Sequence, residues 1–325
     1  MTTEKIEEIK IQNPSQAKDF IDKQTAAISC AVGQGYAINA LSGGVDSSAV
    51  TMLGHRALEN RLKTYFIDNG LMRENEPQQI ASTFEQLGIN VEIWDVQKQF
   101  FDALRGVTDP EKKREAVTQT FYRDVFADLV RGSQCKYLLQ GTILTDVDET
   151  VAGIKRQHNV FAQLGIDPEK EFGYQILEPL VQIRKDSVRK VAQALGLPEL
   201  IYDRIPFPGP ALATRIIGEV TPERVQTVRQ ATKIVEEELC NKGAFQYLAI
   251  LHQDRVTGMR DGKRDYGQQI EVRCWDSIDA RTATPTQLPY GLECKVANRI
   301  TQEVPGVVSV TYNRTSKPPS CIEAI

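Results

Sequence analysis

The sequence predicts an α/β protein with a doubly wound parallel sheet, followed by a second domain of the α+β class. Up to about residue 205, short apolar segments alternate with helical patterns. This alternation is typical of a parallel sheet with helices on both faces. Residues 206–210 then contain three prolines in five positions, which neither a helix nor a central strand accommodates. We therefore expect domains at residues 1–205 and 206–325.

Local patterns justify each element of the first domain. Short apolar runs with turn residues on both sides predict strands at 36–41, 63–68, 90–96, 136–140 and 174–178. Helical periodicity predicts helices at 46–58, 76–87, 110–130 and 186–195. The third of these helices has Asp109 as its predicted N-cap and Pro110 at its first position. The fourth ends at Gly196.

The second domain has a different order of elements. The pattern predicts strand 213–218, helix 222–240 capped by Thr221, strands 245–251 and 268–275, helix 290–304 and strand 307–312. The order β-α-β-β-α-β is that of a split βαβ sandwich. A small sheet of this kind leaves one face without helices, and we expect that face to form a homodimer interface.

Composition restricts the class of protein. The chain has 325 residues, 41% hydrophobic and 25% charged, with a formal net charge of −4, which is ordinary for a globular protein. This charge argues against a general nucleic-acid or membrane binder. Residues 1–11 are polar and charged, so we expect no signal peptide and a cytoplasmic location. The six cysteines form no C-x-x-C pair and the three histidines are scattered, so we expect reduced thiols and no zinc site.

One motif carries most of the chemical information. Residues 42–48 read Ser-Gly-Gly-Val-Asp-Ser-Ser and lie where a predicted strand turns into a helix. Two glycines allow close backbone approach, and the helix N-terminus offers unpaired N–H groups to an anion. The lysine of the Walker loop is missing and Asp46 is present instead. A carboxylate among phosphates indicates Mg²⁺ between them. The alternative is a Gly/Ser turn that only caps a helix.

This motif resembles the signature of the PP-loop ATP pyrophosphatases, which cleave ATP between its α- and β-phosphates. Further segments make the chain similar to the ATP-pyrophosphatase part of GMP synthetase from about residue 15 onward. These segments are 66–73, 106–110, 140–142, 206–210, 218–223 and 316–319. The resemblance implies a ligase in which the 2-oxygen of xanthosine monophosphate (XMP) attacks the α-phosphorus of ATP, after which ammonia displaces AMP to give GMP.

The resemblance also implies roles for particular residues. Those implied to bind ATP are Ser42, Gly43, Gly44, Val45, Asp46, Ser47, Ser48, Asp68, Gly70, Gly141 and Thr142. Asp46, Lys155 and Lys185 are implied to be catalytic, and Asp46 and Asp146 to bind Mg²⁺. Residues implied to bind the acceptor are His158, Arg215, Lys317 and Glu323. The second domain would serve dimerisation and acceptor binding.

Departures from the family pattern lie on the acceptor side. The chain ends in Ala324-Ile325 where the family has Trp-Glu, and Ala211 and Ile205 replace a frequent Gly and His. A second reading therefore stays open, an enzyme that adenylates another purine nucleotide or a carboxylate. A third reading is a non-catalytic nucleotide sensor or assembly subunit; loss of the loop's Ser or Asp residues would support it, and none is lost. The sequence contains no Gly-x-Cys-x-Gly nucleophile elbow. We expect the ammonia to be free or to come from a separate glutaminase subunit.

Overall fold

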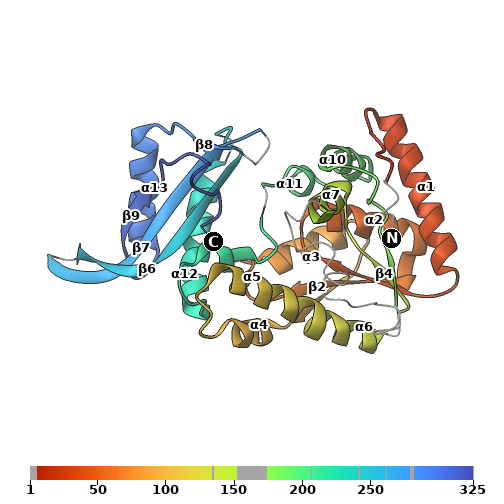
Figure 1. Cartoon of the computed structure of the whole chain (residues 1–325), viewed down its shortest axis with the longest axis horizontal. Coiled ribbons are helices and arrows are strands. Elements are labelled where there is room, and N and C mark those ends of the chain that lie inside the picture. The colour runs from red at the N-terminus through yellow and green to blue at the C-terminus, as the bar shows by residue number, and fades with distance from the viewer. Residues whose placement is uncertain are drawn as a thin grey trace. The chain divides into compact units, whose positions relative to one another are not determined.

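The computed structural model describes residues 6–133, 135–151, 174–205, 207–240, 242–260, 262–278 and 282–324. The chain forms two compact units (Figure 1). The N-terminal unit comprises Met1–Asp68, Glu76–Asp95 and Thr118–Arg204. The C-terminal unit comprises Asn69–Asn75, Val96–Val117 and Ile205–Ile325. Two segments from the first half of the chain therefore fold with the second half.

A five-stranded parallel sheet forms the centre of the N-terminal unit. Its order is β3-β2-β1-β4-β5, and every pairing is parallel. The strands are β1 (Ala37–Leu41), β2 (Leu62–Asp68), β3 (Val91–Asp95), β4 (Tyr137–Leu139) and β5 (Gln175–Leu177). All five predicted strands and the doubly wound arrangement are confirmed. From β1 the chain continues to β2, toward one edge of the sheet, and from β4 it continues to β5, toward the other edge. The strand order therefore reverses between β1 and β4, and open α/β sheets bind ligands at such a switch point.

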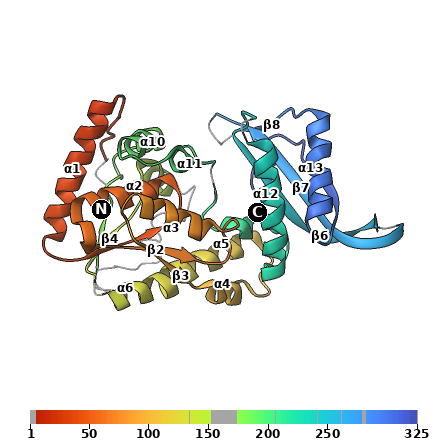
Figure 2. The ribbon, with the colours of Figure 1, turned by 180° about the vertical axis from the view of Figure 1, so that it is seen from behind.

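Helices cover both faces of this sheet (Figures 1 and 2), with α1, α2 and α10 on one face and α6 on the other. In the described part of this unit, the helices and helical turns are α1 (Pro14–Val32), α2 (Val45–Leu58), η1 (Glu59–Arg61), α3 (Glu76–Gln86), η2 (Thr120–Phe126), α6 (Ala127–Ser133), α7 (Leu144–Val151), α10 (Lys185–Ala194) and α11 (Glu199–Tyr202). The first of them is absent from the sequence prediction, although Asn13 caps it by accepting a hydrogen bond from the Gln16 N–H at 3.0 Å.

The predicted helix at 110–130 proves to be three segments. It begins as α5 (Pro110–Gln119), and Asp109 caps it by accepting from the Lys112 N–H at 2.9 Å, as predicted. The next seven residues, η2, form a π-helix, and α6 follows. A π-helix carries extra residues per turn and changes which side chains share a face, and such segments are frequent at functional sites. Here the segment carries Phe121, Tyr122 and Phe126.

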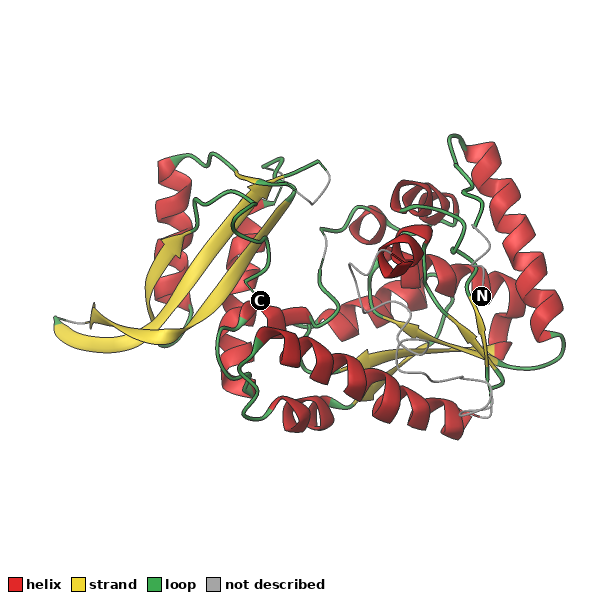
Figure 3. Ribbon diagram, viewed as in Figure 1, coloured by secondary structure: helices red, strands yellow, loops and turns green. Residues whose placement is uncertain are grey.

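The C-terminal unit has a second sheet, formed by a long hairpin and two short strands (Figure 3). Strand β6 (Gln246–Arg260) pairs antiparallel with β7 (Lys263–Asp276), which also pairs with β8 (Thr284–Pro285) and with β9 (Val307–Tyr312). The remaining elements are α4 (Gln97–Leu104), η3 (Ala211–Arg215), α12 (Pro222–Leu239) and α13 (Tyr290–Glu303). Helices α12 and α13 lie on the same face of the sheet (Figures 1 and 2).

Two details of the second sheet differ from the prediction. The expected strand at 213–218 is the short helix η3 followed by one isolated bridge between Ile216 and Leu251. The preceding Pro-Gly-Pro run turns the chain, and Ala211 has a φ of 53°, which a strand does not allow. In addition, β7 and β9 pair with each other directly, so no strand separates them as the split βαβ arrangement requires.

Segment 96–117 is joined to the rest of the C-terminal unit through an unusual buried lysine. The side chain of Lys113 is fully buried, and its Nζ donates to the Ile216 carbonyl at 2.7 Å. Burial, together with the nearby Arg224, lowers the pKa of Lys113 to about 8.

Among the described residues, no helix of either unit is long and apolar enough to cross a membrane.

Candidate functional site

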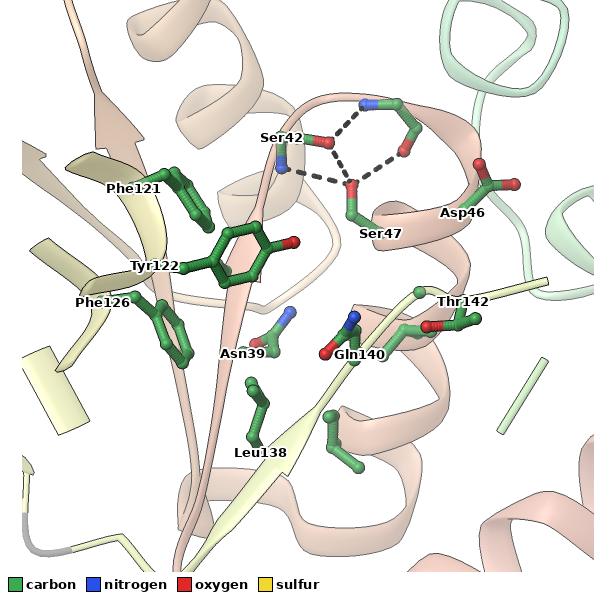
Figure 4. Close-up of a pocket in the computed structure, with 15 residues that line it drawn as sticks. Asn39, Ser42, Asp46, Ser47, Phe121, Tyr122, Phe126, Leu138, Gln140 and Thr142 are labelled. Atoms are coloured by element: carbon green, nitrogen blue, oxygen red, sulfur yellow. Dashed lines mark hydrogen bonds between the residues drawn. The ribbon is translucent and has the colours of Figure 1, made fainter. Parts of the chain in front are cut away.

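The Ser42–Ser48 loop connects the carboxyl end of β1 to the first turn of α2. Gly44 is the N-cap of α2, with extended backbone angles and no side-chain cap. The first-turn N–H groups are therefore not capped by a side chain, which is the usual arrangement of an anion site. Ser42 and Ser47 hold the loop together, because the Ser47 Oγ donates to the Gly44 carbonyl at 3.0 Å and lies 3.0 Å from the Ser42 Oγ (Figure 4).

Asp46 and Lys185 meet although 139 residues separate them in the chain. Asp46 lies in the first turn of α2, and Lys185 is the first residue of α10. The Lys185 Nζ donates to the Asp46 Oδ2 at 2.6 Å. The other carboxylate oxygen, Oδ1, is buried and has no hydrogen-bond partner among the described residues. One oxygen of this carboxylate is thus available to a ligand.

A cavity of about 210 Å³ opens beside this loop. Its walls come from the carboxyl ends of β1 and β4, from α2 and from the π-helix η2 (Figure 4). The lining residues are Asn39, Ala40, Ser42, Gly44, Asp46, Ser47, Val50, Phe121, Tyr122, Phe126, Leu138, Leu139, Gln140, Gly141 and Thr142. The cavity is therefore lined by the polar Ser42–Ser48 loop on one side and by apolar side chains on another.

The sequence prediction misses the aromatic wall. Phe121 lies edge-on to Tyr122 at a ring-centroid distance of 4.9 Å and stacks on Phe126 at 6.1 Å. Aromatic residues in a helical pattern usually pack in a core. The sequence does not reveal that this segment is a π-helix, in which Phe121, Tyr122 and Phe126 all line the cavity. Burial, followed by the charges of Asp146 and Glu178, raises the pKa of Tyr122 to about 12. The Tyr122 hydroxyl therefore stays protonated near neutral pH.

Gly141 and Thr142 follow the carboxyl end of β4 and line the cavity beside the loop. A Cβ on Gly141 would come within 3.1 Å of the Asp46 carbonyl carbon and of the Ser47 nitrogen. Any larger residue would therefore push the two backbones apart by a few tenths of an ångström. The Thr142 hydroxyl donates to the Glu178 Oε1 at 2.6 Å, which holds the end of β4 in place.

Some predicted ATP-binding residues do not line the cavity. Val45 and Ser48 are buried, and neither is among the residues that line the cavity. Asp68 ends β2 and pairs in register with Asp95 of β3. Gly70 belongs to the C-terminal unit, where its carbonyl accepts from the Arg229 Nη2 at 2.7 Å.

The predicted Mg²⁺ ligands have different surroundings. Asp46 has the available oxygen described above. Asp146 is almost fully buried, and its Oδ2 accepts from the Ile143 N–H at 3.0 Å, which closes the N-terminus of α7 as in a capping box. The described residues contain no group of three or more His, Cys, Asp or Glu side chains that could hold a metal ion. Lys155 and His158 lie outside the described residues.

The predicted acceptor-binding residues lie in the C-terminal unit. Arg215 is fully buried and pairs with Glu323 at 3.4 Å. Within the described part of the chain its Nη1 atom has no hydrogen-bond partner, although a buried guanidinium normally satisfies its donors. Glu323 also accepts from the Gln246 Nε2 at 3.0 Å. Lys317 is held through its backbone, which exchanges two hydrogen bonds with Ala283.

A charged network holds the C-terminal segment that carries Glu323. The Arg273 Nη1 donates to the carbonyls of residues 321, 322 and 323, at 2.6, 3.2 and 3.1 Å. Arg273 is itself paired with Glu271 at 2.5 Å, and Glu271 also lies 2.9 Å from the His252 Nε2. Burial alone would raise the pKa of Glu271, but hydrogen bonds from His252, Arg273 and Asn313 outweigh it and lower the pKa to about 2. Glu271 is therefore ionised and anchors Arg273.

Comparison with known proteins matches each part of the chain to a family and nearly the whole chain to one kind of enzyme subunit. Residues 232–324 match the family described as GMP synthase C terminal domain, and residues 34–142 match the family described as Asparagine synthase. One subunit of the glutamine-hydrolyzing GMP synthase of Pyrococcus furiosus is 44% identical over 94% of this chain and 96% of its own. The corresponding subunits from Methanocella arvoryzae and Archaeoglobus fulgidus are 46% and 45% identical over 94% of this chain and 98% of theirs. The chain therefore belongs to the family of these GMP synthase subunits.

Proposed function

We propose that this protein is the synthetase subunit of a GMP synthase, an ATP-dependent carbon–nitrogen ligase that converts XMP to GMP. The observation that carries this proposal is the Asp46–Lys185 pair at a serine- and glycine-rich loop that lacks the Walker lysine. Family membership over nearly the whole chain supports the identity of the acceptor.

The reaction has two steps. The 2-oxygen of XMP attacks the α-phosphorus of ATP, and the bond to the β-phosphate bridging oxygen breaks as pyrophosphate leaves. Ammonia then adds to C2, loses a proton, and AMP departs with the former 2-oxygen. Such chemistry depends mainly on positioning and on neutralising the charge of the leaving group.

The N-terminal unit supplies the groups for the first step. The N–H groups at the start of α2, with the hydroxyls of Ser42 and Ser47, would hold the departing pyrophosphate. Lys185, whose side chain is 46% exposed, would neutralise part of its charge. Phe121 and Phe126 offer an apolar wall for the adenine.

The residues present fit a Mg²⁺ ion. Asp46 has a carboxylate oxygen beside the loop that no described residue binds, and Mg²⁺ characteristically takes one or two protein carboxylates and completes its shell with phosphate oxygens and water. The ion would neutralise phosphate charge. We propose Asp46 as its main protein ligand and Asp146 as a second ligand.

The C-terminal unit supplies the proposed acceptor site. We propose that Arg215, whose buried Nη1 is bound by no described residue, contacts the anionic nucleotide. We propose Lys317 and Glu323 as further contacts. Lys155 and His158 remain proposals from the resemblance. We also propose that residues 1–205 carry ATP activation and residues 206–325 acceptor binding.

We propose three features of the working assembly. The relatives are named as subunits of a glutamine-hydrolyzing enzyme, so we propose that a separate glutaminase subunit delivers ammonia to this chain. The sheet face opposite α12 and α13, together with exposed Met259 and Tyr266, supports a homodimer through the C-terminal unit. All six cysteines are free thiols, which supports a cytoplasmic location.

Product analysis tests the proposed function. The protein is incubated with ATP, MgCl₂, ammonium chloride and XMP, and the nucleotides are separated by chromatography. We expect GMP and AMP in equal amounts, and no GMP when glutamine replaces ammonium. ADP as the product would contradict the class of enzyme. ATP cleavage with another acceptor but not with XMP would contradict the acceptor.

A further inference from the structure

We infer that Arg204, held by Glu76, is a positioning residue that sets the orientation of the phosphate-binding loop. This inference rests on the proposed function, because it assigns the loop to ATP. The brace is defined as the side chains of Arg204 and Glu76 together with the carbonyl group of Gly43. Neither side chain of the brace lines the cavity.

The contacts of the brace are direct and shielded. The Arg204 Nη1 donates to the Gly43 carbonyl at 2.9 Å, and the Arg204 Nη2 donates to the Glu76 Oε1. The Glu76 side chain is 4% exposed and the Arg204 side chain 18%. A carboxylate this buried requires a cation, and loss of one partner of such a pair leaves an uncompensated charge. The pairing with Glu76 therefore fixes the Arg204 side chain in a position from which its Nη1 binds the Gly43 carbonyl of the loop.

Peptide geometry carries the effect to the ligand side. The peptide between Gly43 and Gly44 is planar and trans, so its N–H points opposite to its C=O. Arg204 binds the carbonyl, which fixes the plane and directs the Gly44 N–H away from Arg204. Gly44 lines the cavity, and its nitrogen donates only a long hydrogen bond, of 3.5 Å, to the Ser42 Oγ (Figure 4). So long a bond is weak, and a phosphate oxygen in the cavity would replace it as the acceptor.

The space around Gly43 shows that the brace is packed against the loop. Gly43 has a φ of +74°, and a Cβ there would meet the Arg204 Nη1 at 2.9 Å, Ile80 at 3.2 Å and Glu76 at 3.3 Å. The loop therefore has little room to shift toward the brace at Gly43, and the hydrogen bond from Arg204 to the Gly43 carbonyl opposes a shift away from it.

The competing explanation is that Arg204 and Glu76 form an ordinary structural ion pair. A purely structural pair would change the amount of folded protein when mutated, but it would not change the affinity of the folded protein for ATP. Nucleotide affinity therefore separates the two explanations.

Binding of α,β-methylene-ATP, whose α–β link cannot be cleaved, tests the inference by calorimetry in the presence of Mg²⁺. We expect Arg204→Gln to weaken binding about tenfold to a hundredfold, as loss of a charged hydrogen bond does. Arg204→Lys should give an intermediate affinity, because one ammonium bonds either Gly43 or Glu76 but not both in the same geometry. Glu76→Gln, which keeps the shape of the side chain, should weaken binding less than Arg204→Gln does.

Arg189→Gln is the matched control. It removes an ion pair with Asp203, the residue before Arg204, at 3.7 Å, and this pair includes no atom of the loop. We expect its affinity to stay within twofold of wild type, and the KM for XMP to stay within twofold in all folded variants.

Several outcomes would overturn the inference. The inference is wrong if the Arg204→Gln variant binds the analogue as tightly as wild type. It is also wrong if Arg189→Gln weakens binding of the analogue as much as Arg204→Gln does. If Arg204→Gln does not fold, wild-type affinity in both Glu76→Gln and Arg204→Lys would overturn it. If the wild-type protein does not bind the analogue, the proposed function and this inference are both wrong. If the wild-type protein binds it, the affinities of the variants test the role of the brace alone.

Discussion

Substitution of Gly141 by alanine tests the close contact between the end of β4 and the phosphate-binding loop. The added Cβ would lie 3.1 Å from two backbone atoms of residues 46 and 47, and 3.4 Å from the Asp46 Cβ. Ordinary contacts of carbon atoms are about 3.5–4.0 Å, so the two backbones must separate by about 0.4 Å or more. Backbone atoms cannot rotate away as a side chain does, and overpacking of this kind costs about 1–3 kcal/mol of stability.

The catalytic effect should exceed the loss of stability. A misplacement of about 1 Å at a reacting centre costs about a hundredfold in rate, so a shift of about 0.4 Å at Asp46 should lower kcat/KM for ATP about tenfold. Pyrophosphate release under steady-state conditions measures the rate, and urea unfolding measures the stability. The control is Gly132→Ala in α6, where an added Cβ meets nothing within 4 Å and alanine should stabilise the helix by about 0.5–1 kcal/mol. Wild-type kcat/KM in Gly141→Ala would refute the reasoning.

Three further predictions concern charged residues. Asp46→Asn should abolish pyrophosphate release but change the unfolding free energy by no more than about 1 kcal/mol, because its partner Lys185 is half exposed; turnover within threefold of wild type would refute its proposed role. Lys317→Ala should raise the KM for XMP about tenfold or more and leave the KM for ATP within twofold, because Lys317 and the loop belong to different units; an equal rise of both constants would contradict this. The pKa of Lys113 is lowered to about 8 in the folded state, below the value of about 10.4 in unfolded chains. The unfolded chain binds more protons between these values, so wild type should gain stability relative to Lys113→Met as the pH rises from about 8 to 10; a constant difference in unfolding free energy would contradict the assignment.

Much of the N-terminal unit was predictable because its signals are local. Each buried strand is a short apolar run, and the Ser42–Ser48 motif marks one strand–helix turn. Because β1 is central and ligands bind at the carboxyl ends of parallel strands, the place of the site followed from topology. Lys185 was predicted from the resemblance, and only the structure shows that it pairs with Asp46.

The parts that were missed depend on contacts distant in the sequence. The segments at 69–75 and 96–117 look like ordinary loops and helices, and nothing local indicates that they fold with the second half of the chain. The Arg204–Glu76 pair spans 128 residues. The strand expected at 213–218 failed because the preceding prolines and the positive φ of Ala211 turn the chain, which overrides the apolar pattern.

Transfer of an oxygen isotope tests the central claim most directly. XMP labelled with ¹⁸O at the 2-position is converted with ATP, Mg²⁺ and ammonium, and the AMP and pyrophosphate are separated and analysed by mass spectrometry. If the enzyme adenylates the 2-oxygen, one ¹⁸O atom appears in the phosphate of each AMP formed, and GMP and pyrophosphate carry none. Unlabelled AMP formed together with GMP, or label found in pyrophosphate, would contradict the account.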